Sequence, residues 1–186
     1  MMVAGEVDPE RLVFVDEMGA HTSLAPLYGY SRKGERVRLE VPRNRGKNTT
    51  LLASMTLLGG MGETLAVEGS TDQEVFEAYV EEHALAPTLQ VGQVVVMDNL
   101  SAHKPAKVRE LIESRGCELI YLPAYSPDFN PIEEAFAKIK DVLRQAGART
   151  KDALMGVLDE ALSAVSAQDA RGYFEHAGYR LQAQLL

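Results

Sequence analysis

The alternation of apolar and polar positions predicts strands in the first part of the chain and helices in the last part. Before residue 70 the extended segments are LVFVD at 12–16, short pieces around Leu27–Tyr30 and Val37–Val41, and longer runs at 49–58 and 63–69. Glycines at 59, 60 and 62 join the last two runs as a hairpin candidate. Together these segments predict an antiparallel meander of about three strands.

From Ser70 onward the apolar period changes to one that is typical of helices alternating with buried strands. The predicted order is a helix from Ser70 or Thr71 to about His83, a strand at 93–99, a helix at 105–114, a strand at 117–123, a helix that opens at Pro131, and helices at 150–165 and from 168 onward. The run QVVVMDN at 93–99 is apolar enough for a central strand buried on both faces. We therefore expect an α/β fold, a mixed sheet with an antiparallel meander followed by parallel strands and helices on both faces.

The composition is typical of one soluble domain. The chain has 186 residues, of which 46% are hydrophobic and 25% are charged, and such a length buries a core without disulfides or a structural metal. A single cysteine excludes an internal disulfide framework and favours a reducing, cytosolic compartment. The most apolar stretch, 51–62, is well short of the ~20 residues that span a bilayer, so no membrane association is expected.

The net charge of -8 argues at first against nucleic acid, but the charge is unevenly distributed. Residues 31–48 contain seven basic and two acidic side chains, which gives this segment a charge of +5. A charge run is usually a solvated face, but this one also suits phosphate contacts, and the expected DNA-binding side chains in it are Arg32, Lys33, Arg43, Arg45 and Lys47. Residues 63–82 carry seven acids and no base, so that face should avoid DNA.

Three acids occupy positions from which side chains can reach one crevice. Asp16 ends the first predicted strand and Asp98 ends the buried strand, and the carboxyl ends of strands face the crevice of an open α/β sheet. Glu133 and Glu134 lie in the first turn of the helix that opens at Pro131, about 100° apart, so at most one of them can face a given crevice. The alternative roles are turn residues for the two aspartates and compensation of the helix dipole for the glutamates.

Converging carboxylates without a cluster of histidine or cysteine suit a hard cation such as Mg²⁺ or Mn²⁺. Two such ions activate a water or hydroxyl and stabilise the leaving oxygen when a phosphodiester is cut. The acids therefore predict metal-dependent chemistry on a phosphodiester.

Three strings resemble the acidic motifs of the mariner-like transposase superfamily and are most similar to its bacterial insertion-sequence branch. They are VFVDEMG at 13–19, VVVMDNLSAHK at 94–104 and LPAYSPDFNPIEEAFAKIK at 122–140. The 34 residues that separate Asp98 from Glu133 match the family's spacing before its third acid. The resemblance runs from about Leu12 to Ile139.

This resemblance implies an RNase H-like fold and a DDE catalytic triad that cuts and rejoins DNA with two Mg²⁺ or Mn²⁺ ions. Asp16, Asp98 and Glu133 match the triad, with Asp16 touching both ions and the other two acids holding one each. His103 matches the family's Asp-Asn-x-x-x-His pattern and is a further candidate DNA contact, although a local hydrogen-bonding role is the alternative. The implied partners are transposon-end and target DNA, with a homodimer as one candidate for the active complex.

The domain organisation expected from the resemblance is one catalytic domain over 1–186, with a helical tail from about 150. Only 15 residues precede Asp16, too few for the helix-turn-helix region that recognises DNA in this family. An excised domain, a truncated copy and the product of a split reading frame all agree with that pattern. The alternative functions are a repurposed RNase H-like nuclease and a non-catalytic remnant that binds and regulates a transposase.

Overall fold

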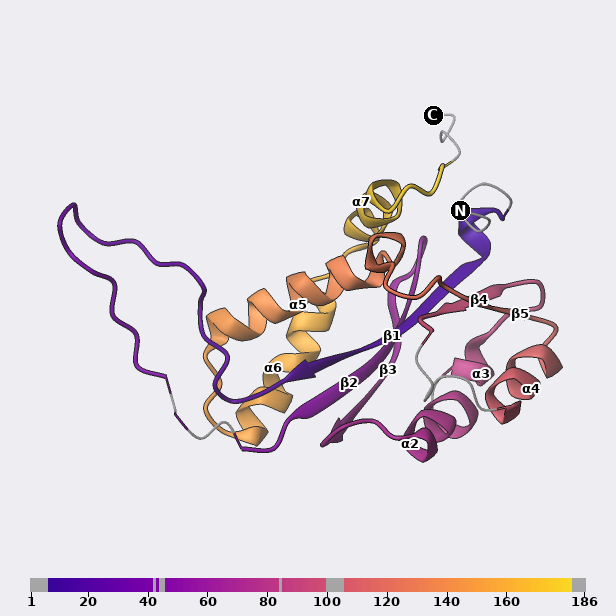
Figure 1. Cartoon of the computed structure of the whole chain (residues 1–186), viewed down its shortest axis with the longest axis horizontal. Coiled ribbons are helices and arrows are strands. Elements are labelled where there is room, and N and C mark those ends of the chain that lie inside the picture. The colour runs from indigo at the N-terminus through magenta and orange to yellow at the C-terminus, as the bar shows by residue number, and fades with distance from the viewer. Residues whose placement is uncertain (1–6, 42, 44–45, 84, 100–105, 182–186) are drawn as a thin grey trace.

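A five-stranded mixed sheet forms the centre of the molecule (Figure 1). The computed structural model describes residues 7–41, 43, 46–83, 85–99 and 106–181. The strands are β1 (Leu12–Ala20), β2 (Thr49–Thr56), β3 (Gly60–Glu68), β4 (Val94–Met97) and β5 (Glu118–Tyr121), in the spatial order β3-β2-β1-β4-β5. The β1–β2 and β2–β3 pairs are antiparallel, whereas the β1–β4 and β4–β5 pairs are parallel, so the predicted meander followed by parallel strands is confirmed.

The helices follow the predicted order. They are α2 (Gln73–Ala78), which continues as the π-helical turn η2 (Tyr79–His83), α3 (Leu85–Thr88), α4 (Ala106–Ser114), α5 (Ile132–Ala146), α6 (Lys151–Ser163) and α7 (Ala167–His176), with short 3₁₀ turns η1 (Pro9–Arg11) and η4 (Pro127–Phe129). Asp72 caps α2, in place of the predicted Ser70 or Thr71, by accepting from Val75 N at 3.0 Å. The short α3, which contains Pro87, lies between the predicted helix that ends at about His83 and the predicted strand at 93–99 and was not predicted. No helix among the described residues is long and apolar enough to cross a membrane.

Two separate cores cover the two faces of the sheet, because successive residues of a strand point to opposite faces. Phe14 and the other even-numbered residues of β1 pack with α5, α6 and α7, whereas Val13 and Val15 pack with α2, α3 and α4. The rings of Phe14 and Phe174 meet edge to face with their centroids 5.3 Å apart. The prediction of helices on both faces is therefore confirmed, and the helices that follow residue 150, α6 and α7, contribute to the core.

The first strand is longer than predicted. Residues 17–20 extend β1 beyond the predicted 12–16 because they pair with β2, from Glu17 opposite Leu52 to Ala20 opposite Thr49. The parallel partner β4 ends earlier, at Met97 opposite Val15. Asp16 is therefore in the middle of β1 and not at its end, but it is the first residue of β1 beyond the parallel pairing.

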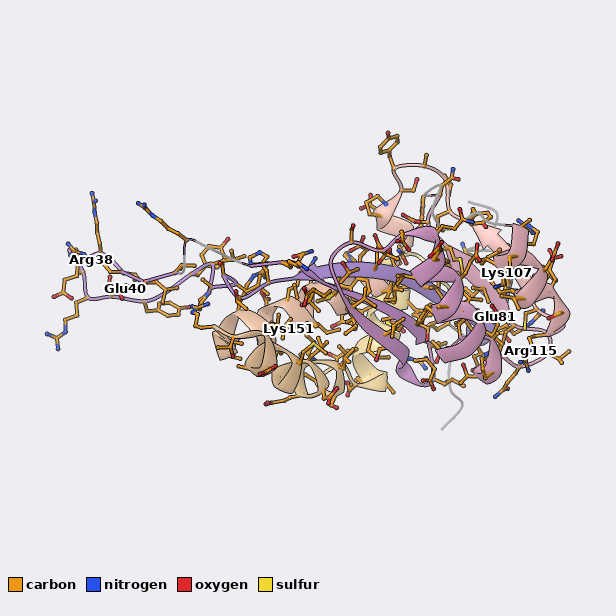
Figure 2. All side chains as sticks on the ribbon, turned by 90° about the horizontal axis from the view of Figure 1, so that it is seen from below. Arg38, Glu40, Glu81, Lys107, Arg115 and Lys151 are labelled. Atoms are coloured by element: carbon orange, nitrogen blue, oxygen red, sulfur yellow. The ribbon has the colours of Figure 1, made fainter. Side chains whose placement is uncertain are left out.

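Residues 21–41, 43 and 46–48 lie in a long arm that projects away from the sheet (Figures 1 and 2). The predicted extended pieces at 27–30 and 37–41 are not strands, because no neighbouring strand pairs with the described part of the arm, and an isolated strand is unstable in water. At the foot of the arm, Arg149 donates to the carbonyl oxygens of Thr22 and Leu24 at 3.1 and 2.8 Å. Lys47 closes the other side through an ion pair with Glu68 at 3.0 Å.

Candidate active site

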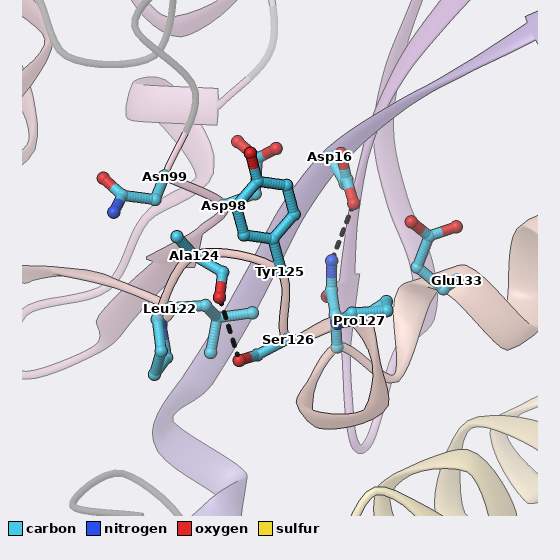
Figure 3. Close-up of a pocket in the computed structure, with 11 residues that line it drawn as sticks. Asp16, Asp98, Asn99, Leu122, Ala124, Tyr125, Ser126, Pro127 and Glu133 are labelled. Atoms are coloured by element: carbon cyan, nitrogen blue, oxygen red, sulfur yellow. Dashed lines mark hydrogen bonds between the residues drawn. The ribbon is translucent and has the colours of Figure 1, made fainter.

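A cleft of about 350 Å³ lies beyond the carboxyl ends of β4 and β5 (Figure 3). The three acids that the sequence singled out, Asp16, Asp98 and Glu133, all line it. The remaining wall consists of Asn99, Asn130 and the loop 122–127. The structure thus brings together side chains from β1, the end of β4 and the start of α5.

The parallel pairing of β1 and β4 sets Asp98 beside Asp16. Val15 is opposite Met97, and one further residue along each chain leads to the two aspartates. Neighbouring strands are about 4.8 Å apart, so the two aspartates directly follow a pair of residues on adjacent strands. Asp16 and Asp98 both have even numbers, and the even-numbered apolar side chains of β1 and β4 face α5. The two carboxylates therefore leave the sheet on the side where Glu133 begins its helix.

The first turn of α5 separates its two glutamates. Glu133 lines the cleft, whereas Glu134 does not. The Oε1 atom of Glu134 instead contacts His176 Nδ1 at 2.7 Å. That carboxylate raises the pKa of His176 above its ordinary value. The expectation that at most one of the two glutamates faces the crevice agrees with this arrangement.

Asp16 is 5% exposed and both of its carboxylate oxygens accept hydrogen bonds. The backbone N–H of Glu17 donates to Oδ1 at 2.7 Å, and Asn130 Nδ2 donates to Oδ2 at 2.6 Å. A buried carboxylate requires such partners, because desolvation otherwise disfavours its charged form. The sequence analysis did not single out Asn130, because no local pattern links it to a side chain 114 positions away.

The amide of Asn130 has one end satisfied and one end unsatisfied. Its Oδ1 is buried and accepts no hydrogen bond from the described residues. Turning the amide over would set this oxygen against the Asp16 carboxylate, so the orientation that leaves it unpaired is the better one. Leaving a buried acceptor unpaired costs about 1–3 kcal/mol of desolvation free energy, and the hydrogen bond to Asp16 has to offset this cost.

The donor set of the cleft consists of oxygen ligands, which suits Mg²⁺ or Mn²⁺ rather than a metal that prefers thiolate or imidazole. Within the described ranges, no three histidine, cysteine, aspartate or glutamate side chains are grouped closely enough to hold one ion together. In the view of Figure 3 the Asp16 carboxylate lies between those of Asp98 and Glu133. What the residues present share with a site for such an ion is therefore the chemistry of their oxygen donors.

Comparison of the sequence with models of known protein families gives a match. The sequence model of the family described as DDE superfamily endonuclease matches residues 11–155. The chain belongs to the DDE superfamily endonucleases. No curated protein sequence matches it.

Solved structures similar to this DDE endonuclease domain are of Mos1 transposase. The Mos1 paired-end complex with the left transposon end has a TM-score of 0.74 and 20% identity, covering 91% of this chain and 53% of that one. The catalytic domain of Mos1 mariner transposase has a TM-score of 0.60 and 17% identity, covering 93% and 85%. The chain therefore has the RNase H-like fold of transposase catalytic domains and spans about half the length of the Mos1 chain in the paired-end complex.

The basic side chains that the sequence assigned to DNA lie apart from the cleft of this DDE endonuclease domain. Arg32, Lys33 and Arg43 are exposed on the arm and do not line the cleft. Lys47 lines a second pocket, of about 300 Å³, at the foot of the arm. Two further candidates, Arg45 and His103, lie outside the described residues.

Proposed function

We propose that this DDE endonuclease domain is the catalytic domain of a transposase, of the mariner-like type and most similar to the bacterial insertion-sequence branch. It cuts DNA and joins a 3′ end to new DNA with Mg²⁺ or Mn²⁺. The observation that carries the proposal is the convergence of three carboxylates from three elements on one cleft. Mos1 complexes have been solved with Mn and with Mg, which supports the choice of metal.

In this proposal Asp16, Asp98 and Glu133 are the catalytic and metal-binding residues. Asp16 contacts both of two ions, while Asp98 and Glu133 hold one each, which agrees with the central position of Asp16 in Figure 3. Such ions activate the attacking water or hydroxyl and stabilise the leaving oxygen. The side chains contribute by keeping their charges beside a polyanionic substrate, and the hydrogen bonds to Asp16 hold its carboxylate in one orientation.

The experiment replaces one charge at a time while keeping the shape of the side chain. We expect Asp98→Asn or Glu133→Gln to abolish metal-dependent nicking of transposon-end DNA without loss of the fold. Glu134→Gln is the matched control, because Glu134 is in the same helical turn but does not line the cleft. Full activity in either of the first two variants would refute the assignment.

The products identify the reaction. A 3′ end joined to new DNA indicates a transposase, whereas hydrolysis alone indicates a nuclease. Calorimetry with millimolar Mn²⁺ separates both from a non-catalytic remnant, which would bind no metal.

The arm is the proposed DNA contact outside the cleft. Its exposed cations, among them Lys33 and Arg43, suit contacts with DNA phosphates. Each such contact makes the slope of log affinity against log salt concentration steeper by about 0.9. The double variant Lys33→Ala/Arg43→Ala should weaken DNA binding and reduce that slope by about 2. Arg115→Ala is the control, because Figure 2 shows Arg115 at the end of the molecule opposite the arm.

The arm also carries exposed apolar side chains, which support the homodimer. Tyr28 and Tyr30 are 91% and 105% exposed, and Leu27 is also largely exposed. Aromatic residues on a projecting segment are common at interfaces, where a partner can bury them. Sedimentation of the double variant Tyr28→Ser/Tyr30→Ser tests this point, since it should shift a dimer toward monomer.

A further inference from the structure

The loop that leads from β5 to α5 connects the first and the third acid of the site through one residue. The side chain of Asn130 donates to Asp16 Oδ2 at 2.6 Å, and its backbone carbonyl accepts from the N–H of Glu133 at 3.1 Å. Its own N–H closes the preceding turn onto Pro127 O at 2.8 Å. Asn130 is therefore bonded at three points and touches both the strand and the helix that present the acids.

The side chain of Asn130 is oriented by its hydrogen bond to Asp16, although this orientation leaves its own amide oxygen unpaired. The residue is 5% exposed, and its Oδ1 has no partner among the described residues. A buried amide that leaves one end unpaired while the other end holds a carboxylate is oriented by that carboxylate. Each oxygen of a carboxylate has two lone pairs, so the bond from Asn130 does not by itself exclude a metal from the same group.

The C-terminal segment holds the same loop from the other side. The hydroxyl of Tyr179, a residue that is 2% exposed, donates to Phe129 O at 2.8 Å. Its ring lies 5.3 Å from that of Phe14 and 5.6 Å from that of Phe174. Phe14 precedes Asp16 by two positions and faces the same side of β1, so Tyr179 contacts both the strand and the loop that Asn130 joins.

Burial also keeps the Tyr179 hydroxyl in its protonated form, because it raises the pKa of Tyr179 to about 12. The hydroxyl therefore remains a donor at any pH at which the domain works. Tyr179 lies after residue 155, where the match to the endonuclease family ends.

We propose that Asn130 is a positioning residue that sets Asp16 and Glu133 relative to each other for metal binding, and that Tyr179 holds its loop in place. The proposal rests on the proposed function, because it explains how the carboxylates of that site are held. Neither residue touches the reacting atoms. Partners of metal ligands that act in this way typically contribute 10–100-fold to metal affinity.

Calorimetric titration of the whole chain with Mn²⁺ tests the proposal. Asn130→Ala should lower the Mn²⁺ affinity by about tenfold or more, and Tyr179→Phe should lower it by a smaller factor. Tyr173→Phe is the matched control, because it removes a hydroxyl from α7 and should leave the affinity unchanged. In DNA cleavage, the half-saturating Mn²⁺ concentration should rise in parallel, while the rate at saturating Mn²⁺ changes little.

The metal dependence separates positioning from a structural role. A general loss of folding lowers activity at every Mn²⁺ concentration, whereas a positioning defect is restored by more metal. If Asn130→Ala does not fold, Tyr179→Phe, which keeps the ring and its packing, carries the test. Wild-type affinity in folded Asn130→Ala, or in Tyr179→Phe when that variant carries the test, overturns the inference.

The contact itself can be measured without metal, which keeps failure of the inference distinct from failure of the proposed function. The side-chain amide signal of Asn130 in an NMR spectrum should shift when Asp16 is replaced by alanine. A protein with this shift that binds no Mn²⁺ contradicts the proposed function. An amide signal that does not respond to Asp16→Ala contradicts the bridge.

Discussion

Asp169 joins the N-terminus of α7 to α5, the helix that begins with Glu133. Its Oδ2 accepts from Ser166 N at 2.8 Å while its own N–H donates to Ser166 Oγ at 3.1 Å, and these two bonds form a capping box. The same Oδ2 also accepts from Ser166 Oγ at 2.6 Å and from Lys138 Nζ at 2.8 Å. These contacts lower the pKa of Asp169 from 3.8 to about 2, with the Lys138 bond as the largest cause. Asp169→Asn, which keeps the shape but removes the charge, should therefore destabilise the fold.

The magnitude follows from the pKa. A lowering from 3.8 to about 2 corresponds to at most about 2.5 kcal/mol, at 1.36 kcal/mol per tenfold change in proton affinity. Solvent screens this surface site, so we expect about 1 kcal/mol at pH 7. Because the pKa is lowered in the folded state, the contribution is complete well above pH 4 and is lost as the pH falls toward 2, with about half remaining near pH 3.

Urea unfolding of the wild-type protein and Asp169→Asn, from pH 7 to pH 3, measures this contribution. The difference in the free energy of unfolding should be about 1 kcal/mol at pH 7, equivalent to about 2–4 °C in Tm, and should shrink as the pH falls. Asp159→Asn, at an exposed acid of α6, is the matched control and should change little. A difference between wild type and Asp169→Asn that is constant or that grows at low pH would refute the reasoning.

Three further predictions concern the core, the cysteine and the arm. Phe174→Ala removes a fully buried ring and should cost about 3–5 kcal/mol in urea unfolding; a cost below 1 kcal/mol would mean that α7 is not part of the core. Burial raises the pKa of the Cys117 thiol, so an aromatic disulfide reagent should react slowly at pH 8 in the folded protein and quickly in urea; equal rates would contradict this. Lys151 and Lys47 lower the pKa of Glu68 to about 2, which indicates that both lysines hold its carboxylate. Glu68→Gln removes the ion pair with Lys47 and should therefore speed trypsin cleavage at the foot of the arm; an unchanged cleavage rate would contradict this.

The strands and helices could be predicted because their apolar periods are local. Val94–Met97, the strand within the predicted run 93–99, is buried on both faces, as the composition of the run indicated. Thr150 caps α6 by accepting from Ala153 N at 3.2 Å, at the residue where that helix was predicted to begin. The predictions were wrong where pairing between strands decides whether a segment is extended into a sheet. β1 extends to Ala20 because β2 continues beside it, and the described part of the arm has no strands because no neighbouring strand pairs with it.

The sequence by itself determined the order of the elements and the chemistry of the site. The three acids Asp16, Asp98 and Glu133 could be found from their places in strands and in the first turn of a helix, together with the spacing between them. Those features depend on neighbouring residues, which the sequence contains in full. The unevenness of the charge, with a basic segment before the second strand, was visible in the same way.

Only the tertiary structure decided how those acids are held. The Asn130–Asp16 bond joins residues 114 positions apart, and the Tyr179–Phe129 bond joins residues 50 positions apart. Such contacts depend on how the helices pack on the sheet, because packing and not local preference fixes which distant side chains meet. For the same reason, only the structure shows which residues α7 contacts when it packs into the core, among them Phe14 through Phe174.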